Sequence, residues 1–121
     1  MSVSASYKSF VLEQLGQVLP VTSRPMFGGV GVYSGGLFFA LMDDDRLYFK
    51  VDEGSRPTYQ AQGLRAFDPF KDGRTMEGYY EAPSECLEDP DELAPWAREA
   101  LAVAGRAALK KGKSKPRKKA P

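Results

Sequence analysis

Residues 24–33, RPMFGGVGVY, hold the first pattern that could support chemistry, because glycines cluster there beside an apolar stretch. A dinucleotide-binding loop needs a strand, then G-x-G-x-x-G, then a helix whose N-terminus meets the phosphates. After Gly29 and Gly31 the third glycine is missing, strand-like residues follow, and the Gly-Lys-Ser/Thr of a Walker loop is absent. We therefore interpret these glycines as positions of close backbone approach or of a bulge at the start of a strand.

The sequence contains few candidate residues for nucleophilic or metal-dependent catalysis. There is no histidine, which excludes Ser-His-Asp and Cys-His catalysis and histidine-dependent metal sites. Cys86 is the only cysteine, and it stands between Glu85 and Glu88, whose charges disfavour a thiolate. We expect a buried or idle thiol, and a single cysteine also fits a reducing cytosol.

Two groups of carboxylates could act together. Asp43, Asp44 and Asp45 could bind a hard cation, since carboxylates suit calcium or magnesium. Glu77 and Glu81 would share one face of a strand and could form an acid/base pair. The spacing of a calcium-binding loop is absent, however, and nothing indicates that either glutamate is buried. We predict a charged turn and a solvated strand edge, with no catalytic residue, no metal and no cofactor.

Aromatic residues could stack on the bases of single-stranded nucleic acid. Only Lys50 interleaves them in the predicted strands, so core packing is the favoured interpretation. The aromatic residues in question are Phe38, Phe39, Tyr48, Phe49, Tyr79 and Tyr80.

Charge divides the chain into an acidic part and a basic part. Residues 1–109 carry ten Lys/Arg and sixteen Asp/Glu, whereas residues 110–121 carry seven Lys/Arg and no acid. We expect a folded domain over 1–109 and a disordered basic tail over 110–121, which lacks apolar residues for a core. Such a tail attracts nucleic acid without reading its sequence, solubilises the chain, or docks back on the acidic body. Its candidate contacts are Lys110, Lys111, Lys113, Lys115, Arg117, Lys118 and Lys119.

Hydrophobic periodicity and turn residues predict the order helix, three strands, helix, two strands, helix. This order favours an α+β fold, a two-layer sandwich in which helices cover one face of a five-stranded antiparallel sheet. The longest apolar run, residues 37–42, is far shorter than the ~20 residues of a membrane helix, and no signal peptide is evident, so we expect a cytoplasmic protein. The predicted helices are 4–18, 53–62 and 84–109, and the predicted strands are 30–33, 37–42, 46–52, 64–68 and 75–81.

Three segments resemble the N-terminal domain of the TfoX/Sxy proteins: RPMFGGVGVY, GLFFALMDDDRLYFKVDE and YYEAPSECLEDPDELAPWAREAL. The resemblance covers roughly residues 5–105. It implies a five-stranded sheet in a secretion-chaperone-like architecture, a regulatory role in competence gene transcription, and neither enzymatic activity nor cofactor. The residues that match the family's signature run, and are candidates for contact with a partner, are Arg24, Met26, Phe27, Gly28 and Gly29.

These observations favour a non-enzymatic regulatory or adaptor domain that binds a protein partner, as a monomer or homodimer, with its tail attracting nucleic acid. The alternative is a small ligand- or nucleotide-binding protein, or an enzyme, that uses the Gly28–Gly31 loop. Within the signature run, we expect Phe27 to anchor packing. Arg24 lies in the predicted connector before the first strand, either as a contact residue or in an ion pair with a nearby carboxylate.

Overall fold

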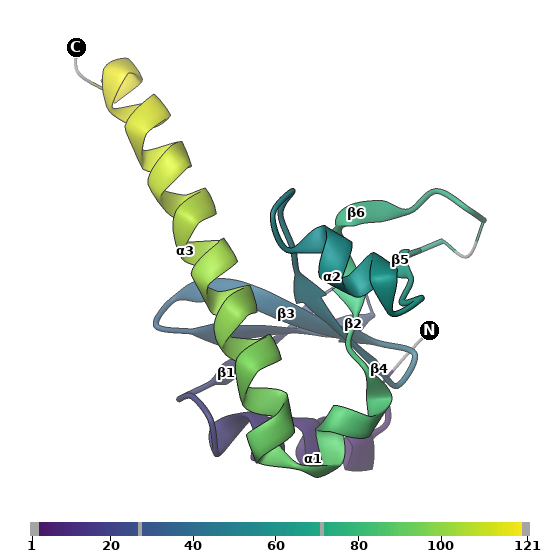
Figure 1. Ribbon diagram of the computed structural model, residues 1–121. Coiled ribbons are helices and arrows are strands. Elements are labelled where there is room, and N and C mark those ends of the chain that lie inside the picture. The colour runs from purple at the N-terminus through teal and green to yellow at the C-terminus, as the bar shows by residue number, and fades with distance from the viewer. Residues whose placement is uncertain (1–2, 27, 71, 120–121) are drawn as a thin grey trace.

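One antiparallel sheet carries a layer of helices (Figure 1). This computed structural model describes residues 3–26, 28–70 and 72–119. The strands are β1 (Thr22–Met26), β2 (Gly29–Ser34), β3 (Leu37–Asp43), β4 (Arg46–Lys50), β5 (Ala66–Phe67) and β6 (Met76–Glu81). The helices are α1 (Ala5–Gly16), α2 (Arg56–Ala61), the 3-10 helix η1 (Ser84–Glu88) and α3 (Pro90–Lys119).

The strands lie in the order β1-β2-β3-β4-β6-β5, and all neighbouring pairs are antiparallel. The α+β class is therefore confirmed, but the predicted count of five strands is wrong, because β1 adds a sixth. The sequence predicts a connector before residue 30, whereas the structure has β1 there. β1 is an edge strand that pairs only with β2, where Pro25 lies opposite Val30. Proline is tolerated in an edge strand, because its missing N–H can face solvent.

Two-residue turns join β2 to β3 and β3 to β4. Gly35 and Gly36 have φ angles of 57° and 81°, and Asp44 and Asp45 have φ angles of 55° and 53°. Positive φ at both central residues is what a tight hairpin turn between twisted strands requires, and aspartate tolerates it better than most residues. Asp44 and Asp45 thus form a hairpin turn, as predicted, whereas Asp43 is the last residue of β3 and is buried.

The start of α1 is attached to this hairpin. Asp45 accepts hydrogen bonds from the Ser4 amide, at 2.7 Å, and from the Ser4 hydroxyl, at 3.1 Å. The Ser4 hydroxyl oxygen accepts in turn from the amide of Tyr7 at 3.2 Å, and so caps the helix. Asp45 therefore fixes the beginning of α1 against the sheet.

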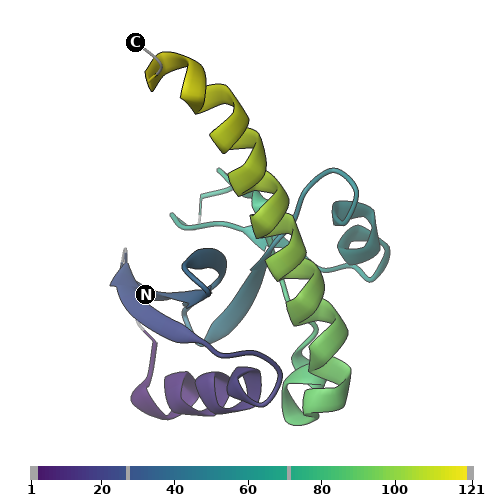
Figure 2. The same cartoon turned by 90° about the vertical axis from the view of Figure 1, so that its left-hand side faces the viewer.

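All of the helices contribute to one core on one side of the sheet. α3 crosses β3 and β4, and α1 lies across one end of the sheet beside the start of α3 (Figures 1 and 2). Helix periodicity explains this packing, since Val11 and Leu15 of α1 lie four residues apart, as do Leu93 and Ala97 of α3. The most deeply buried side chains include Val11, Leu15, Val32, Phe39, Met42, Phe49, Tyr59 and Leu93.

The opposite face of the sheet holds a smaller cluster. Leu41, Tyr48 and Phe67 are buried there, and Phe38 and Tyr79 pack against them. All five residues come from strands, and no residue of a described helix belongs to the cluster. One face of the sheet is therefore covered by helices, whereas the buried cluster on the other face is built from strand residues alone.

The structure divides the predicted helical region over 84–109 into η1 and α3. The region is interrupted at Asp89, whose carboxylate accepts from the amide of Asp91 at 3.0 Å and caps α3, with Pro90 as its first residue. At its other end α3 continues to Lys119, where composition had predicted a tail without regular structure. The division of the chain at residue 109 stays a prediction.

Candidate functional site

The glycine run forms the β1–β2 turn and the start of β2. A Cβ atom on Gly29 would collide with the backbone oxygen of Met42 on the neighbouring strand. A Cβ on Gly31 would lie 3.1 Å from Met26 Sδ and from an atom of the Phe38 ring. The hollow beside Gly29 has only about 20 Å³, whereas ligand pockets have roughly 300–1,000 Å³. Close approach of backbone and side chains accounts for these two glycines, as interpreted from the sequence.

The other signature residues differ in what they present to solvent. Arg24 is exposed and lies on β1, not in a connector, with its guanidinium carbon 5.5 Å from the centroid of the Tyr33 ring. No carboxylate among the described residues forms an ion pair with it. Met26 is half-buried, and Gly28 occupies the turn at a φ of 80°. Phe27 lies outside the described residues, so its packing role stays a prediction.

A groove of about 420 Å³ lies between α2 and the first half of α3. Its lining combines aromatic, small and polar side chains. Trp96 and Tyr59 meet edge to face inside it, with ring centroids 4.9 Å apart and planes at 72°, a favourable arrangement for two aromatic rings. The lining residues are Gly54, Ser55, Thr58, Tyr59, Pro95, Trp96 and Glu99.

Tyr59 is only 1% exposed, and its ring contributes to both the groove and the core. Its hydroxyl is buried and has no hydrogen-bond partner among the described residues. Burial, with smaller contributions from Cys86 and Glu99, raises the pKa of Tyr59 above its ordinary value. The hydroxyl therefore remains a protonated donor, and leaving such a donor unpaired costs about 1–3 kcal/mol.

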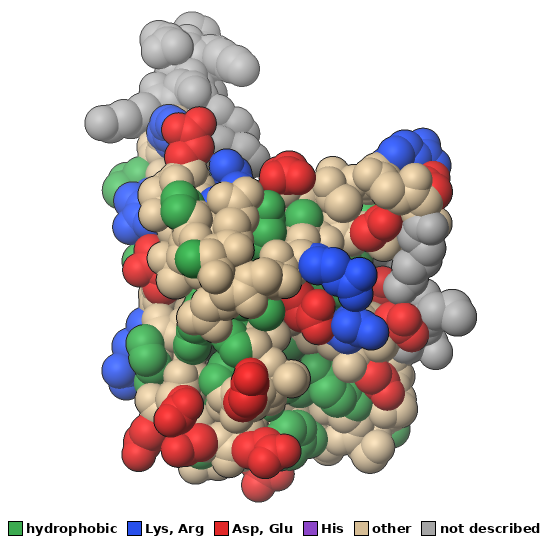
Figure 3. Space-filling model, turned by 45° about the vertical axis from the view of Figure 1, so that its right-hand side comes forward, with side chains coloured by type: hydrophobic (Ala, Val, Ile, Leu, Met, Phe, Trp, Pro, Cys, Tyr) green, Lys and Arg blue, Asp and Glu red, His purple; other side chains and the backbone are tan. Residues whose placement is uncertain are grey.

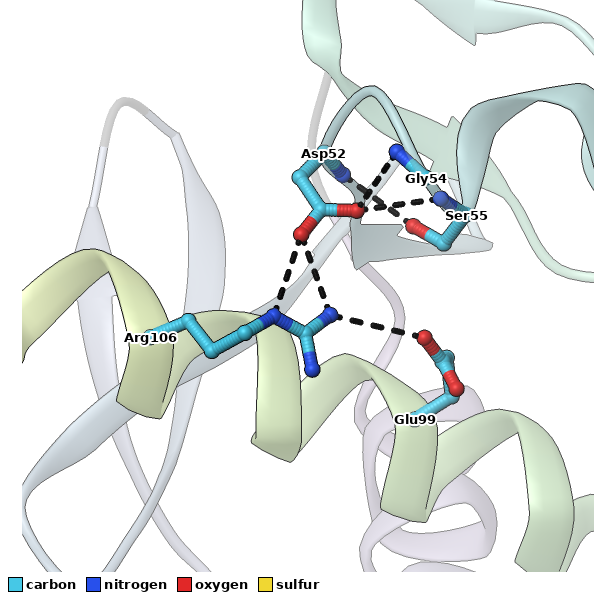
Figure 4. A network of polar contacts seen from close by, with 5 residues as sticks. All are labelled: Asp52, Gly54, Ser55, Glu99 and Arg106. Atoms are coloured by element: carbon cyan, nitrogen blue, oxygen red, sulfur yellow. Dashed lines mark hydrogen bonds and ion pairs between the residues drawn. The ribbon is translucent and has the colours of Figure 1, made fainter.

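A polar network fixes the rim of the groove (Figure 4). Asp52 Oδ1 accepts from the amides of Gly54 and Ser55 at 3.1 and 3.0 Å, and the Ser55 hydroxyl accepts from the Asp52 amide at 3.1 Å. Arg106 of α3 donates to Asp52 Oδ2 at 3.0 Å and lies 3.6 Å from Glu99. The segment around Asp52, which leads into the groove wall at Gly54 and Ser55, is thus bonded to α3.

The electrostatics of this rim favour an ionised Asp52. Burial alone would raise the pKa of Asp52, but hydrogen bonds from Arg106 and from Ser55 outweigh it and hold that pKa below the ordinary carboxyl value. The Arg106 guanidinium, whose own pKa is raised chiefly by its hydrogen bond to Asp52, stays charged. Both partners keep their charges through the neutral range, so the ion pair persists there.

A wider hollow of about 690 Å³ borders β5 and β6. Several of its polar groups are already paired with one another. Arg46 and Glu81 form an ion pair at 3.1 Å, the Tyr80 hydroxyl donates to Glu77 at 3.2 Å, and Gln60 donates to that hydroxyl at 3.2 Å. Glu77 and Glu81 thus have different partners. These pairings leave the hollow less suited to a ligand than the groove.

Cys86 is 3% exposed and lies in η1. Burial, and then the charge of Glu85, raises the pKa of the Cys86 thiol to about 11. A thiol with that pKa is almost fully protonated at neutral pH, which is unfavourable for nucleophilic attack. Within the described residues, no group of three or more Cys, Asp or Glu side chains could hold a metal ion.

The basic residues of the predicted tail lie in the last part of α3. Lys110 is exposed, and residues 111–119 continue the helix, which extends away from the sheet in Figures 1 and 2. These residues lie on α3 well beyond the groove, which is bordered by residues 95–99 of the same helix. The structure does not bring the tail and the groove together.

The fold defines a small α+β domain in which the helices build one core against one face of an antiparallel sheet. The chain belongs to the TfoX N-terminal domain family, whose sequence profile matches residues 13–104. This is a family of regulatory domains associated with competence. No curated protein was found that is significantly similar to the chain. None of the helices in the described part of the chain is long and apolar enough to cross a membrane.

Sequence reasoning did not find the groove. The sequence places Tyr59 only within the predicted helix 53–62 and Trp96 only within the predicted helical region 84–109. The two positions are far apart in the chain, and only the packing of α2 beside α3 brings them together. The weak signal available was Pro95-Trp96, a proline followed by a bulky aromatic residue within a helical pattern.

Proposed function

We propose that this TfoX N-terminal domain is a non-enzymatic regulatory adaptor that binds a protein partner through the α2–α3 groove. The single observation that carries the proposal is the groove itself, with an aromatic floor made by Trp96 and Tyr59 and a polar rim held by Asp52 and Arg106. Protein interfaces have this anatomy, an apolar centre within a polar rim.

The residue types of the groove support a protein occupant. Tryptophan and tyrosine are enriched among the residues that dominate binding energy, and they act in partly enclosed sites. An apolar side chain of the partner would pack against Trp96, which is half-buried, with the Tyr59 ring beneath it. The rim, which includes Glu99 and Thr58, would surround that contact.

The distribution of charge supports a second, weaker interaction with nucleic acid. Acidic side chains gather over η1 and the start of α3 (Figure 3), whereas the other end of α3 carries the seven Lys/Arg of residues 110–121. The acidic end repels phosphates and the basic end attracts them, so nucleic acid would approach the basic end. The exposed acidic residues are Glu85, Glu88, Asp89, Asp91 and Glu92.

The chemistry of the described residues supports binding over catalysis. The groups with strongly raised pKa values, such as Tyr59 and Cys86, owe them first to burial, which keeps both groups protonated at neutral pH. An enzyme site needs groups with pKa values adjusted toward the working pH. We propose that the domain contributes to transcriptional regulation in the cytoplasm, as the family association suggests.

A capture experiment tests this proposal. The full chain is immobilised, and lysate of the source organism is applied with and without nuclease. We expect the parent chain to capture a protein even after nuclease treatment. The Ala61→Arg variant should capture the same protein, and the Thr58→Arg variant should not. Thr58 and Ala61 are both exposed on α2, but only Thr58 lines the groove, so the added charge is matched. Loss of every captured protein with nuclease, or equal loss in both variants, would contradict the proposal.

A further inference from the structure

A row of three aromatic rings crosses the sheet face opposite the helices. Tyr33 of β2 and Phe38 of β3 have ring centroids 5.2 Å apart, and Phe38 and Tyr79 of β6 have centroids 5.6 Å apart. We call Tyr33, Phe38 and Tyr79 the aromatic row. Each of the three side chains is partly exposed, in contrast to the fully buried rings of the main core.

A cation lies over the ring at each end of the aromatic row. The Arg24 guanidinium carbon is 5.5 Å from the Tyr33 ring centroid, and Lys50 Nζ is 5.0 Å from the Tyr79 ring centroid. Neither cation forms an ion pair with a carboxylate among the described residues. The rings therefore hold two positive charges on this face that a bound anion could neutralise.

Two features of the surroundings keep this face open. The buried residues beneath the aromatic row, Leu41, Tyr48 and Phe67, all belong to strands, so no described helix packs on them. The exposed acidic residues of η1 and the start of α3 belong to the helical side of the molecule, which builds the other cluster. The face thus combines partly exposed aromatic surface with the charges of Arg24 and Lys50, whereas Glu81, opposite Tyr48 in the β4–β6 ladder, is paired with Arg46.

We propose that the aromatic row is a binding platform for single-stranded nucleic acid. Bases of a flexible strand can stack on aromatic side chains whatever their identity, and cations beside them can pair with the phosphates. Sheets that display aromatic rings commonly stack two or three bases in this way. A duplex keeps its bases stacked inside and cannot present them to the row. The sequence counted only Lys50 as a cation among these rings, whereas pairing of β1 with β2 adds Arg24.

This inference goes beyond the proposed function, since the aromatic row and the α2–α3 groove lie on opposite faces of the sheet. A protein docked on the row is the competing occupant. The observations favour a strand, because the two cations lie over the terminal rings, where phosphates on either side of the stacked bases would meet them.

Fluorescence anisotropy of labelled 12-nucleotide probes tests the proposal with the full chain. The probes are oligo(dT), oligo(U) and a 12-base-pair duplex at one fixed salt concentration. Tyr79→Leu and Phe38→Leu remove a ring but keep apolar volume. We expect each to weaken single-strand binding at least about fivefold, because stacking contributes roughly 1–3 kcal/mol per base. The ratio of the two single-strand affinities shows whether DNA or RNA is preferred.

The matched control is Phe70→Leu. Phe70 is 66% exposed and has the Arg74 guanidinium carbon 4.9 Å from its ring centroid, so it repeats the cation–ring motif outside the row. We expect this variant to bind like the parent chain. Arg24→Gln, at an exposed position that should tolerate it, is expected to weaken binding and to reduce the salt slope by about 0.7.

Three outcomes would overturn the inference: no binding of either single strand, equal loss with Phe70→Leu, or duplex binding that falls as much as single-strand binding when the row is altered. A protein captured from lysate that requires Tyr79, without any strand binding, would also overturn it. Thr58→Arg is expected to leave strand binding unchanged, so the groove proposal and this one can fail separately.

Discussion

Arg106 donates a hydrogen bond to Asp52 across 54 residues of chain, with Nη2 3.0 Å from Oδ2. The contact joins α3 to the segment between β4 and α2 (Figure 4). Without this contact, no polar bond of Asp52 would link α3 to the segment that begins the other wall of the groove. The geometry of the proposed binding site therefore depends on this pair and on the hydrogen bonds that Asp52 accepts from the backbone amides of Gly54 and Ser55.

The first prediction concerns Asp52 and pH. Because its pKa is lowered in the folded state, its contribution to stability is complete above the unfolded carboxyl pKa of about 3.9 and is lost as pH falls below it. Asp52→Asn should lower the free energy of unfolding by no more than about 1 kcal/mol at pH 7, since the pair with Arg106 is partly exposed and screened. Urea denaturation at pH 7 and pH 3 measures the difference, which should shrink at pH 3. A constant difference would contradict this account.

The second prediction compares two glycines in strands. Gly29→Ala should destabilise the chain by roughly 1–3 kcal/mol, because the added methyl group meets the Met42 backbone, which cannot rotate away. Gly78→Ala is the control, since a Cβ there has no neighbour within 4 Å and the residue also lies in a strand. Thermal melts of both variants should show a lower midpoint for Gly29→Ala only. Similar melting of the two variants would refute the close approach.

The third prediction concerns Cys86. A rise of its thiol pKa to about 11 reduces the thiolate fraction at pH 8 roughly 100-fold relative to an ordinary cysteine, and burial also blocks access. A thiol-specific chromogenic reagent should therefore label the folded chain far more slowly than the chain in guanidinium chloride. Equal rates would show that the thiol is accessible in the folded chain and that its pKa is not raised.

The fourth prediction concerns the basic end. Deletion of residues 110–121 removes seven positive charges. If all seven pair with duplex phosphates, the logarithmic salt slope should fall by about 6, because each neutralised phosphate contributes about 0.9. Gel-shift titrations of the full and truncated chains on a duplex at several salt concentrations measure it. An unchanged slope would exclude this segment as the attractive element.

The sequence predicted the elements whose pattern is local. The four-residue repeat of Val11 and Leu15 marked α1, and paired turn residues marked the β2–β3–β4 meander. It missed β1, since a proline argues against a strand unless the strand is known to be at an edge. Edge position is a property of the assembled sheet, which composition does not contain.

Both proposed surfaces depend on contacts between distant parts of the chain. The groove needs α2 beside α3, and the aromatic row needs Arg24 above Tyr33 and Lys50 above Tyr79. Local patterns identified the aromatic residues but could not distinguish a core ring from a partly exposed one. The signature run, in contrast, was correctly interpreted around Gly29, because the reason for glycine there is local crowding.

The central claim is that a protein partner contacts the α2–α3 groove, and site-specific photo-crosslinking tests it most directly. A photoreactive benzoylphenylalanine is placed at position 58, inside the groove, or at position 61, on the same helix outside it. Irradiation in nuclease-treated lysate should give a crosslinked protein from position 58 and none from position 61. Crosslinks of equal yield from both positions, or from position 61 alone, would contradict the claim.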